Sequence, residues 1–128
     1  GSYVLDLHHQ DKPGITFRYL DGTEEYSRPG YPEERRRWRE ETPTNPTFYQ
    51  VPLRSLIPEN TSNIIVAGRM LDASMVAFSG IRVMVNMNQL GEAAGITAFL
   101  ALNQNKRIPD ISFMDVRKKL AEGGSLII

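Results

Sequence analysis

The sequence predicts a fold of the α/β class, or α+β when this chain is taken by itself, because it contains both strand-like and helix-like patterns. The β-branched run at residues 64–67 ends at Gly68, which is typical of a buried strand. A long apolar segment over residues 81–103 has small residues at helical spacing, which predicts a helix with one nearly bare face: Gly91, Ala94, Gly95 and Ala98, followed by Leu102. Such a face favours close packing.

Composition limits the classes of protein to be considered. The chain has 128 residues, 41% of them hydrophobic, and its 15 basic residues balance 15 acidic ones. It is long enough for one domain with a core, and its zero net charge argues against nucleic acid or an anionic membrane as partner. It has no cysteine, which excludes a disulfide framework, a thiol nucleophile and a Cys-based metal site, and fits a cytoplasmic location.

The amino-terminal region predicts a β-hairpin. Residues 3–9 and 15–20 are rich in strand formers, and turn signals follow each run at residues 11–14 and 21–22. His8 and His9 are the only histidines, and neighbouring residues of a strand point to opposite faces. They are therefore a poor metal pair, and we predict no metal site. Gly1-Ser2 is either native or a cloning remnant.

A charged segment, residues 24–46, follows the hairpin. Its arginine cluster around Trp38 has the residue types that grip nucleic acid, but acidic residues flank it on both sides. Glu33 and Arg37 have the spacing of a favourable helical ion pair. We therefore expect a short solvated helix, an insertion or lid, with Trp38 anchoring it.

The remaining elements are predicted from local signals. Residues 48–53 are expected to form an irregular strand and residues 125–128 a buried last strand. A helix over residues 113–121 is expected to begin at the N-cap Ser112 and to end at Gly123. Polar residues interrupt the apolar segment at 81–103, which argues against a membrane span: Asn86, Asn88, Gln89 and Glu92.

The expected start of the long helix at Gly80 is the chemically suggestive point. The first turn of a helix has unpaired N–H groups and the positive end of the helix dipole, which together attract anions. Arg82 is expected in this turn, where a cation is unfavourable unless an anion is bound beside it. Pairing of Arg82 with Asp72 is the alternative, and spacing leaves both open.

Four stretches in order resemble one family: GSYVLDLHHQD, YQVPLRSLIP, NIIVAGRMLDAS and AFSGIRVMVNMNQLGEAAGITAFLAL. They resemble the carboxyl-terminal part of FAD-dependent oxidoreductases with a glutathione-reductase-like flavin fold. The chain departs from that pattern at Leu53, where the family usually has Tyr, at Met75, where it often has His, and at residues 85–87, where Pro-Thr-Cys is usual.

The resemblance implies FAD as cofactor and a small organic substrate that gives hydride or electrons to it. It implies catalytic or substrate-side roles for His8 and Arg54. The residues that it places beside the flavin are Gly68, Arg69, Gly80, Ile81, Arg82 and Val83. Asp72, the carboxylate nearest to Gly68 in the sequence, is a further candidate for cofactor binding, through a hydroxyl group of FAD.

The resemblance also implies that the chain is a carboxyl-terminal part of a Rossmann-like FAD/NAD(P)-binding fold. The chain has no G-x-G-x-x-G motif, so the first dinucleotide-binding unit is expected in the remainder of the same polypeptide. We expect residues 1–58 to belong to a substrate-binding region and residues 59–128 to the flavin domain, and this part alone to be inactive. Self-association into a homo-oligomer is compatible with the sequence.

A different class of function also fits the sequence. The chain would then be a non-catalytic α+β interaction domain, with the small-residue helix as its docking face. The Gly80-x-Arg82 pattern argues against this interpretation, because packing alone does not require it.

Overall fold

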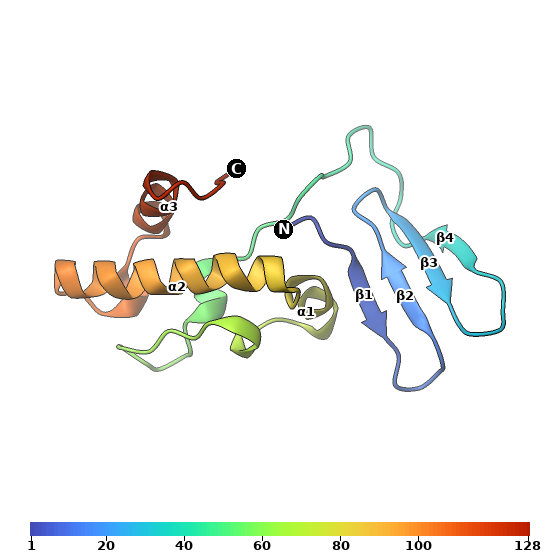
Figure 1. Cartoon of the computed structure of the whole chain (residues 1–128), viewed down its shortest axis with the longest axis horizontal. Coiled ribbons are helices and arrows are strands. Elements are labelled where there is room, and N and C mark those ends of the chain that lie inside the picture. The colour runs from blue at the N-terminus through green and yellow to red at the C-terminus, as the bar shows by residue number, and fades with distance from the viewer. The chain divides into compact units, whose positions relative to one another are not determined.

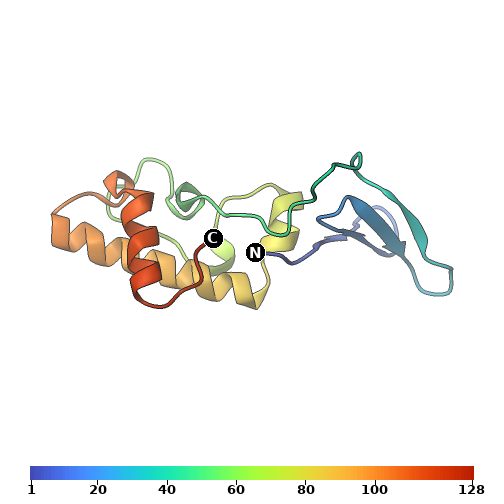
Figure 2. The ribbon, with the colours of Figure 1, turned by 90° about the horizontal axis from the view of Figure 1, so that it is seen from above.

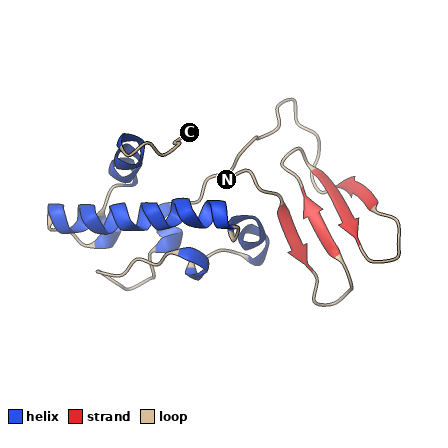
Figure 3. Ribbon diagram, in the orientation of Figure 1, coloured by secondary structure: helices blue, strands red, loops and turns tan.

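The computed structural model describes residues 1–128 and combines a four-stranded antiparallel sheet with three α-helices, which confirms the α+β class. It divides into two compact units. The sheet unit comprises Gly1–Gln50 and Ser74–Ile81, and the helical unit comprises Val51–Ala73 and Arg82–Ile128. Figure 3 shows that every strand belongs to the sheet unit, whereas the helical unit contains only helices and loops.

The sheet follows chain order. Figure 1 shows the strands side by side, and they are β1 (Leu5–His8), β2 (Ile15–Arg18), β3 (Thr23–Ser27) and β4 (Glu34–Arg37). The predicted hairpin is confirmed, since β1 pairs with β2 in antiparallel register and His8 lies opposite Ile15.

The charged segment forms strands rather than the expected short helix. In the β3–β4 pair, Glu24 lies opposite Arg36 and Glu25 opposite Arg35, so opposite charges face each other across the strands. The expected helical pair of Glu33 with Arg37 is absent, and Glu33 lies 3.6 Å from Arg35 instead. An alternation of acidic and basic residues satisfies either geometry locally, and the acidic residues supplied by β3 favour the strand.

Glu24 is the buried charge of the sheet unit. Its side chain is 1% exposed and accepts hydrogen bonds from Nε of Arg18, at 2.5 Å, and from Nε of Arg36. Burial raises the pKa of the Glu24 carboxyl, but the hydrogen bonds and charges of the two guanidinium groups outweigh burial and hold this pKa below its ordinary value. Trp38 anchors the segment as predicted, because its indole N–H donates to the carbonyl oxygen of Tyr19 at 2.9 Å.

The helix α1 (Met75–Ile81) completes the sheet unit and lies before the long helix, which the sequence predicted to start at Gly80. It packs on β1. A Cβ atom on Gly80 would lie 2.8 Å from Cδ2 of Leu5, so a larger residue there would force the Leu5 side chain to shift. The hydroxyl of Tyr49 also donates to the carbonyl oxygen of Gly80 at 2.6 Å.

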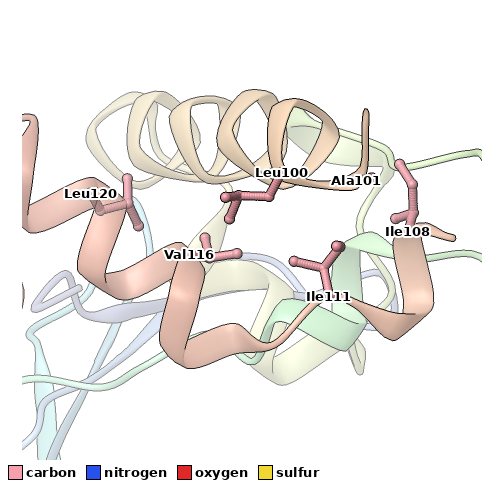
Figure 4. Close-up of a cluster of buried hydrophobic side chains, with 6 residues drawn as sticks. All are labelled: Leu100, Ala101, Ile108, Ile111, Val116 and Leu120. Atoms are coloured by element: carbon pink, nitrogen blue, oxygen red, sulfur yellow. The ribbon is translucent and has the colours of Figure 1, made fainter. Parts of the chain in front are cut away.

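The helical unit is built on α2 (Met84–Gln104), across which α3 (Phe113–Glu122) lies. The two helices cross steeply in Figures 1 and 2. Figure 4 shows the side chains of the buried core that they enclose together with the 3₁₀ helix η3 (Ile108–Asp110): Leu100, Ala101, Ile108, Ile111, Val116 and Leu120.

The boundaries of α3 agree with the sequence-based prediction. The Ser112 hydroxyl caps the helix by accepting from the backbone N–H of Met114 at 3.3 Å. At the other end, Gly123 is the C-cap and its N–H donates to the carbonyl oxygen of Lys119 at 3.0 Å. The predicted cap and stop are therefore confirmed.

Three expected strands are wrong: residues 48–53, 64–67 and 125–128 form no ladder. The first ends in the 3₁₀ helix η1 (Leu53–Leu56). Ile64 is 48% exposed and Leu126 is 76% exposed, so the second and third runs are not buried throughout either. A strand needs a neighbour to satisfy its backbone groups, and the helical unit contains no strand to supply one.

The expected close packing at the small-residue face of α2 is found at Ala94 and Ala98, the latter packed against the core, but not at its glycines. A Cβ atom on Gly91 or Gly95 would meet no atom within 4 Å. Leu102, on the same face, is 83% exposed. Of that set, only Ala94 is buried. The glycines of α2 are therefore not compensated by contacts inside the helical unit.

A matched pair of substitutions tests the core of the helical unit. Leu100→Ala removes a side chain that is 7% exposed and should lower the free energy of unfolding by about 2–5 kcal/mol. Leu102→Ala makes the same change two residues along the same helix, where the side chain is 83% exposed, and should change stability by less than about 0.5 kcal/mol. Urea denaturation followed by circular dichroism measures both, and equal effects would contradict the described core.

The buried carboxylate gives a prediction for the sheet unit. Glu24→Gln should destabilise it by about 1.5–3 kcal/mol at pH 7, the range for hydrogen bonds to charged groups. Because the folded-state pKa is lowered, the stabilisation is complete above the unfolded-state pKa of about 4.3 and is lost as pH falls through the folded-state value. The difference between wild type and variant should therefore shrink in acid. Glu33→Gln, at an exposed carboxylate, is the control, and an equal loss there would refute the special role of Glu24.

Candidate functional site

Two loops of the helical unit are held together by backbone hydrogen bonds. The N–H of Val66 donates to the carbonyl oxygen of Leu56 at 2.8 Å, and the N–H of Asp72 donates to that of Ser55 at 2.9 Å. The side chains of Leu56 and Leu71, which are 1% and 6% exposed, are buried in the same unit. The segment around Arg54 and the segment that contains Gly68 and Arg69 are thus fixed relative to each other.

The start of α2 joins these two loops. The 3₁₀ helix η2 (Gly68–Met70) packs against α2. Nε of Arg69 donates to the carbonyl oxygen of Arg82 at 3.2 Å. Of the predicted cofactor residues, the structure therefore brings Gly68, Arg69, Asp72, Arg82 and Val83 to connected segments of one unit.

The expected helix start at Gly80 is wrong. Gly80 and Ile81 are the last residues of α1, in the sheet unit, and the chain breaks from helical geometry at Arg82 and Val83. The N-cap of α2 is Val83, with ψ of 150°, and the N–H of Met87 donates to its carbonyl oxygen at 3.0 Å. Arg82 thus precedes the first turn instead of lying in it.

This shift changes the physical argument for Arg82. The N-cap residue Val83 makes no side-chain capping hydrogen bond to the N–H groups that follow it. A cation just before the N-cap still lies at the positive end of the helix dipole, although outside the first turn, where the effect is strongest. The shift therefore reduces the unfavourable interaction of Arg82 with the dipole and does not remove it.

Gly68 has an open side that a larger residue would fill. Its φ is +76°, a conformation that favours glycine, and a Cβ atom there would meet nothing within 4 Å. Gly80 is the contrast, since its Cβ direction is filled by Leu5. The Cβ direction is therefore open at Gly68, whereas that at Gly80 is filled by packing.

The two predicted substrate-side residues, His8 and Arg54, belong to different units. His8 ends β1 and is exposed. His9 is engaged inside the sheet unit, because its Nε2 lies 2.6 Å from the hydroxyl of Thr16 and its ring packs edge-on against Tyr26. The two histidines thus differ, since His8 is exposed whereas His9 is engaged within the sheet unit.

Some arginines of the chain pair with carboxylates and others do not. In the sheet unit, Arg18, Arg35 and Arg36 pair with carboxylates at close range. In the helical unit, Arg54 and Arg69 are exposed and form no ion pair. Their guanidinium groups can therefore receive an anionic ligand without breaking an existing pair.

Sequence reasoning missed the residues that hold these loops. Leu56 and Leu71 belong to no recognisable sequence motif. Ser55 contributes its backbone carbonyl oxygen, which residues of every type have. No group of three or more His, Asp or Glu side chains is placed to hold a metal ion. None of the helices is both long and apolar enough to span a membrane.

Comparison with known proteins gives one match. The family model described as FAD dependent oxidoreductase matches residues 1–120. No curated protein and no solved structure matches the chain.

A pair of glycine substitutions tests the geometry of the η2 loop. Gly68→Ala should destabilise the protein by about 1–2 kcal/mol, because a Cβ atom is strained at positive φ. Gly91→Ala should instead stabilise it by about 0.5–1 kcal/mol, since its Cβ would extend into open space from the interior of α2. Thermal and urea unfolding report both signs, and a stabilising Gly68→Ala would contradict the described loop.

Proposed function

The chain belongs to the family of FAD-dependent oxidoreductases, and from this we propose that it is the carboxyl-terminal part of an enzyme with a glutathione-reductase-like, Rossmann-like flavin fold. FAD is the cofactor of this family. When bound, the flavin supplies the redox chemistry by taking hydride or electrons from a small organic substrate. The residues of this chain position the flavin and the substrate.

The observation that carries the proposal is the joining of three segments in the helical unit. Arg69 links η2 to the residue before α2, the N–H of Asp72 links the same loop to Ser55, and Gly68 presents open backbone between them. These contacts connect stretches that resemble the flavin-binding segments of the family. The residues present therefore fit a planar, anionic cofactor.

Each residue has a proposed role that follows from its position. The N–H groups at the start of α2 bind and orient the polar edge of the flavin, and Arg82 adds positive charge beside them. Asp72, exposed after η2, accepts hydrogen bonds from hydroxyl groups of the cofactor. Arg54 binds a carboxylate of the substrate in a bidentate fork. Gly80 and Ile81 keep only a predicted role beside the flavin.

The sheet unit is proposed to belong to the substrate-binding side, with His8 as a hydrogen-bonding residue toward substrate. The motif that holds the ADP part of FAD is absent from these 128 residues, so the proposal assigns it to the remainder of the same polypeptide. A cytoplasmic location, based on the absence of cysteine, is part of the same proposal.

One observation favours a second candidate, an interaction domain. The uncovered side of α2 presents large apolar side chains to solvent, among them Val85, Phe99 and Leu102, which are 71%, 53% and 83% exposed. Such a face is typical of a surface that another polypeptide covers. It is compatible with the first proposal, because the remainder of a flavoenzyme is such a polypeptide.

The visible absorption spectrum of the complete gene product tests the proposed function, and Arg82→Ala sharpens the test. The wild-type product should be yellow, and the variant should bind FAD at least about tenfold more weakly, a loss of about 1.4 kcal/mol, because a positive charge at the end of α2 is removed. Flavin content and the dissociation constant, measured by fluorescence titration, give the result.

Arg107→Ala is the matched control, since this exposed guanidinium in the same unit pairs with Asp110 at 2.8 Å and lies outside the joined loops. It should leave flavin content unchanged. A colourless product after addition of FAD would refute the flavoenzyme and leave the interaction domain. An unchanged dissociation constant in Arg82→Ala would refute the role of Arg82 alone.

A further inference from the structure

Two methionines of the helical unit are unusually exposed. Met70 is 70% exposed and Met84 is 78% exposed, whereas methionine is among the residue types most often buried. Met87, one turn further along α2, is only partly exposed. Exposure of large apolar side chains at two neighbouring loops indicates a surface that a ligand or another segment covers.

The two residues lie on either side of the junction described above. Met70 is the last residue of η2 and follows Arg69 directly, while Met84 is the first residue of α2 and follows Arg82 by two positions. The bond from Nε of Arg69 to the carbonyl oxygen of Arg82 holds these two segments together. The open backbone of Gly68 belongs to the same junction.

The chemistry of the pair fits an aromatic ligand. A thioether is polarisable and unbranched, and it makes favourable contacts with aromatic rings at about 5 Å. The tricyclic ring of a flavin is flat and aromatic, with an apolar benzenoid end. We propose that Met70 and Met84 contact this ring and are covered by it when FAD is bound, an inference that rests on the proposed function and adds two residues to it.

The chain contains its own controls. Met114 is 59% exposed in the first turn of α3, which packs on the part of α2 around Leu100. With a rise of about 1.5 Å per residue, Leu100 lies about 24 Å along α2 from Met84. A flavin at the junction therefore leaves Met114 exposed, and Met87 reports on the folding of α2 itself.

Oxidation by hydrogen peroxide measures the exposure of each methionine. The sulfur takes one oxygen atom from the peroxide, which gives the sulfoxide and one molecule of water. The complete gene product is treated with and without bound FAD, and tandem mass spectrometry gives the initial rate at each methionine. Each rate is divided by that of Met87 in the same sample, so that a general loosening of the flavin-free protein cancels.

Bound FAD should lower the relative rates of Met70 and Met84 by about fivefold or more, because oxidation follows exposure, and should leave that of Met114 unchanged. Fast oxidation of both residues in the yellow protein would overturn the inference while the proposed function stands. Slow oxidation with and without FAD would also overturn it, since another part of the polypeptide would then cover the two methionines. A colourless product would remove both proposals, and its spectrum alone distinguishes that case.

Discussion

The buried stripe of α2 is the constraint on which the helical unit depends. Leu90, Thr97 and Leu100 lie along it, and they are 8%, 0% and 7% exposed. The carboxyl-terminal part of the stripe packs against α3, and η2 packs on the same helix. Thr97 is tolerated in this apolar stripe because its hydroxyl donates to the carbonyl oxygen of Ala93 at 2.7 Å, which satisfies the buried polar group. Because the helix is rigid, it fixes the loop that carries Gly68 and Arg69.

The opposite side of α2 is not packed within the helical unit. Gly91 and Gly95 weaken the helix by about 1 kcal/mol each relative to alanine, and no contact inside the helical unit compensates for this. Phe99 and Leu102 extend the same uncovered side with large apolar surface. Such a helix can pack against other elements on both of its sides, and the helical unit supplies packing partners on one side only.

Much of the fold follows from local signals in the sequence. The β1–β2 hairpin and the cap at Ser112 were predictable, since the residues that determine them lie within a few positions of one another. The strand in the charged segment was not predictable. Glu33, Arg35 and Arg37 are spaced so that they could form ion pairs either along a helix or with residues of a neighbouring strand. The choice depends on Glu24 and Glu25 of the neighbouring strand. The run at residues 64–67 fails for the same reason, since strand propensity cannot supply a partner strand.

The candidate site likewise has some features that the local sequence predicts and others that depend on residues far apart in the sequence. Gly68 and Arg69 are visible in the sequence as the end of a β-branched run, but their link to the residue before α2 is a bond to a backbone oxygen, which no residue type reveals. The helix break at Arg82 and Val83 also contains no proline or glycine from which it could have been predicted. It moves Arg82 from the first turn of α2 to the position before the N-cap Val83. Arg18, Arg35 and Arg36 of the sheet unit pair with carboxylates, whereas Arg54 and Arg69 of the helical unit are exposed and form no ion pair.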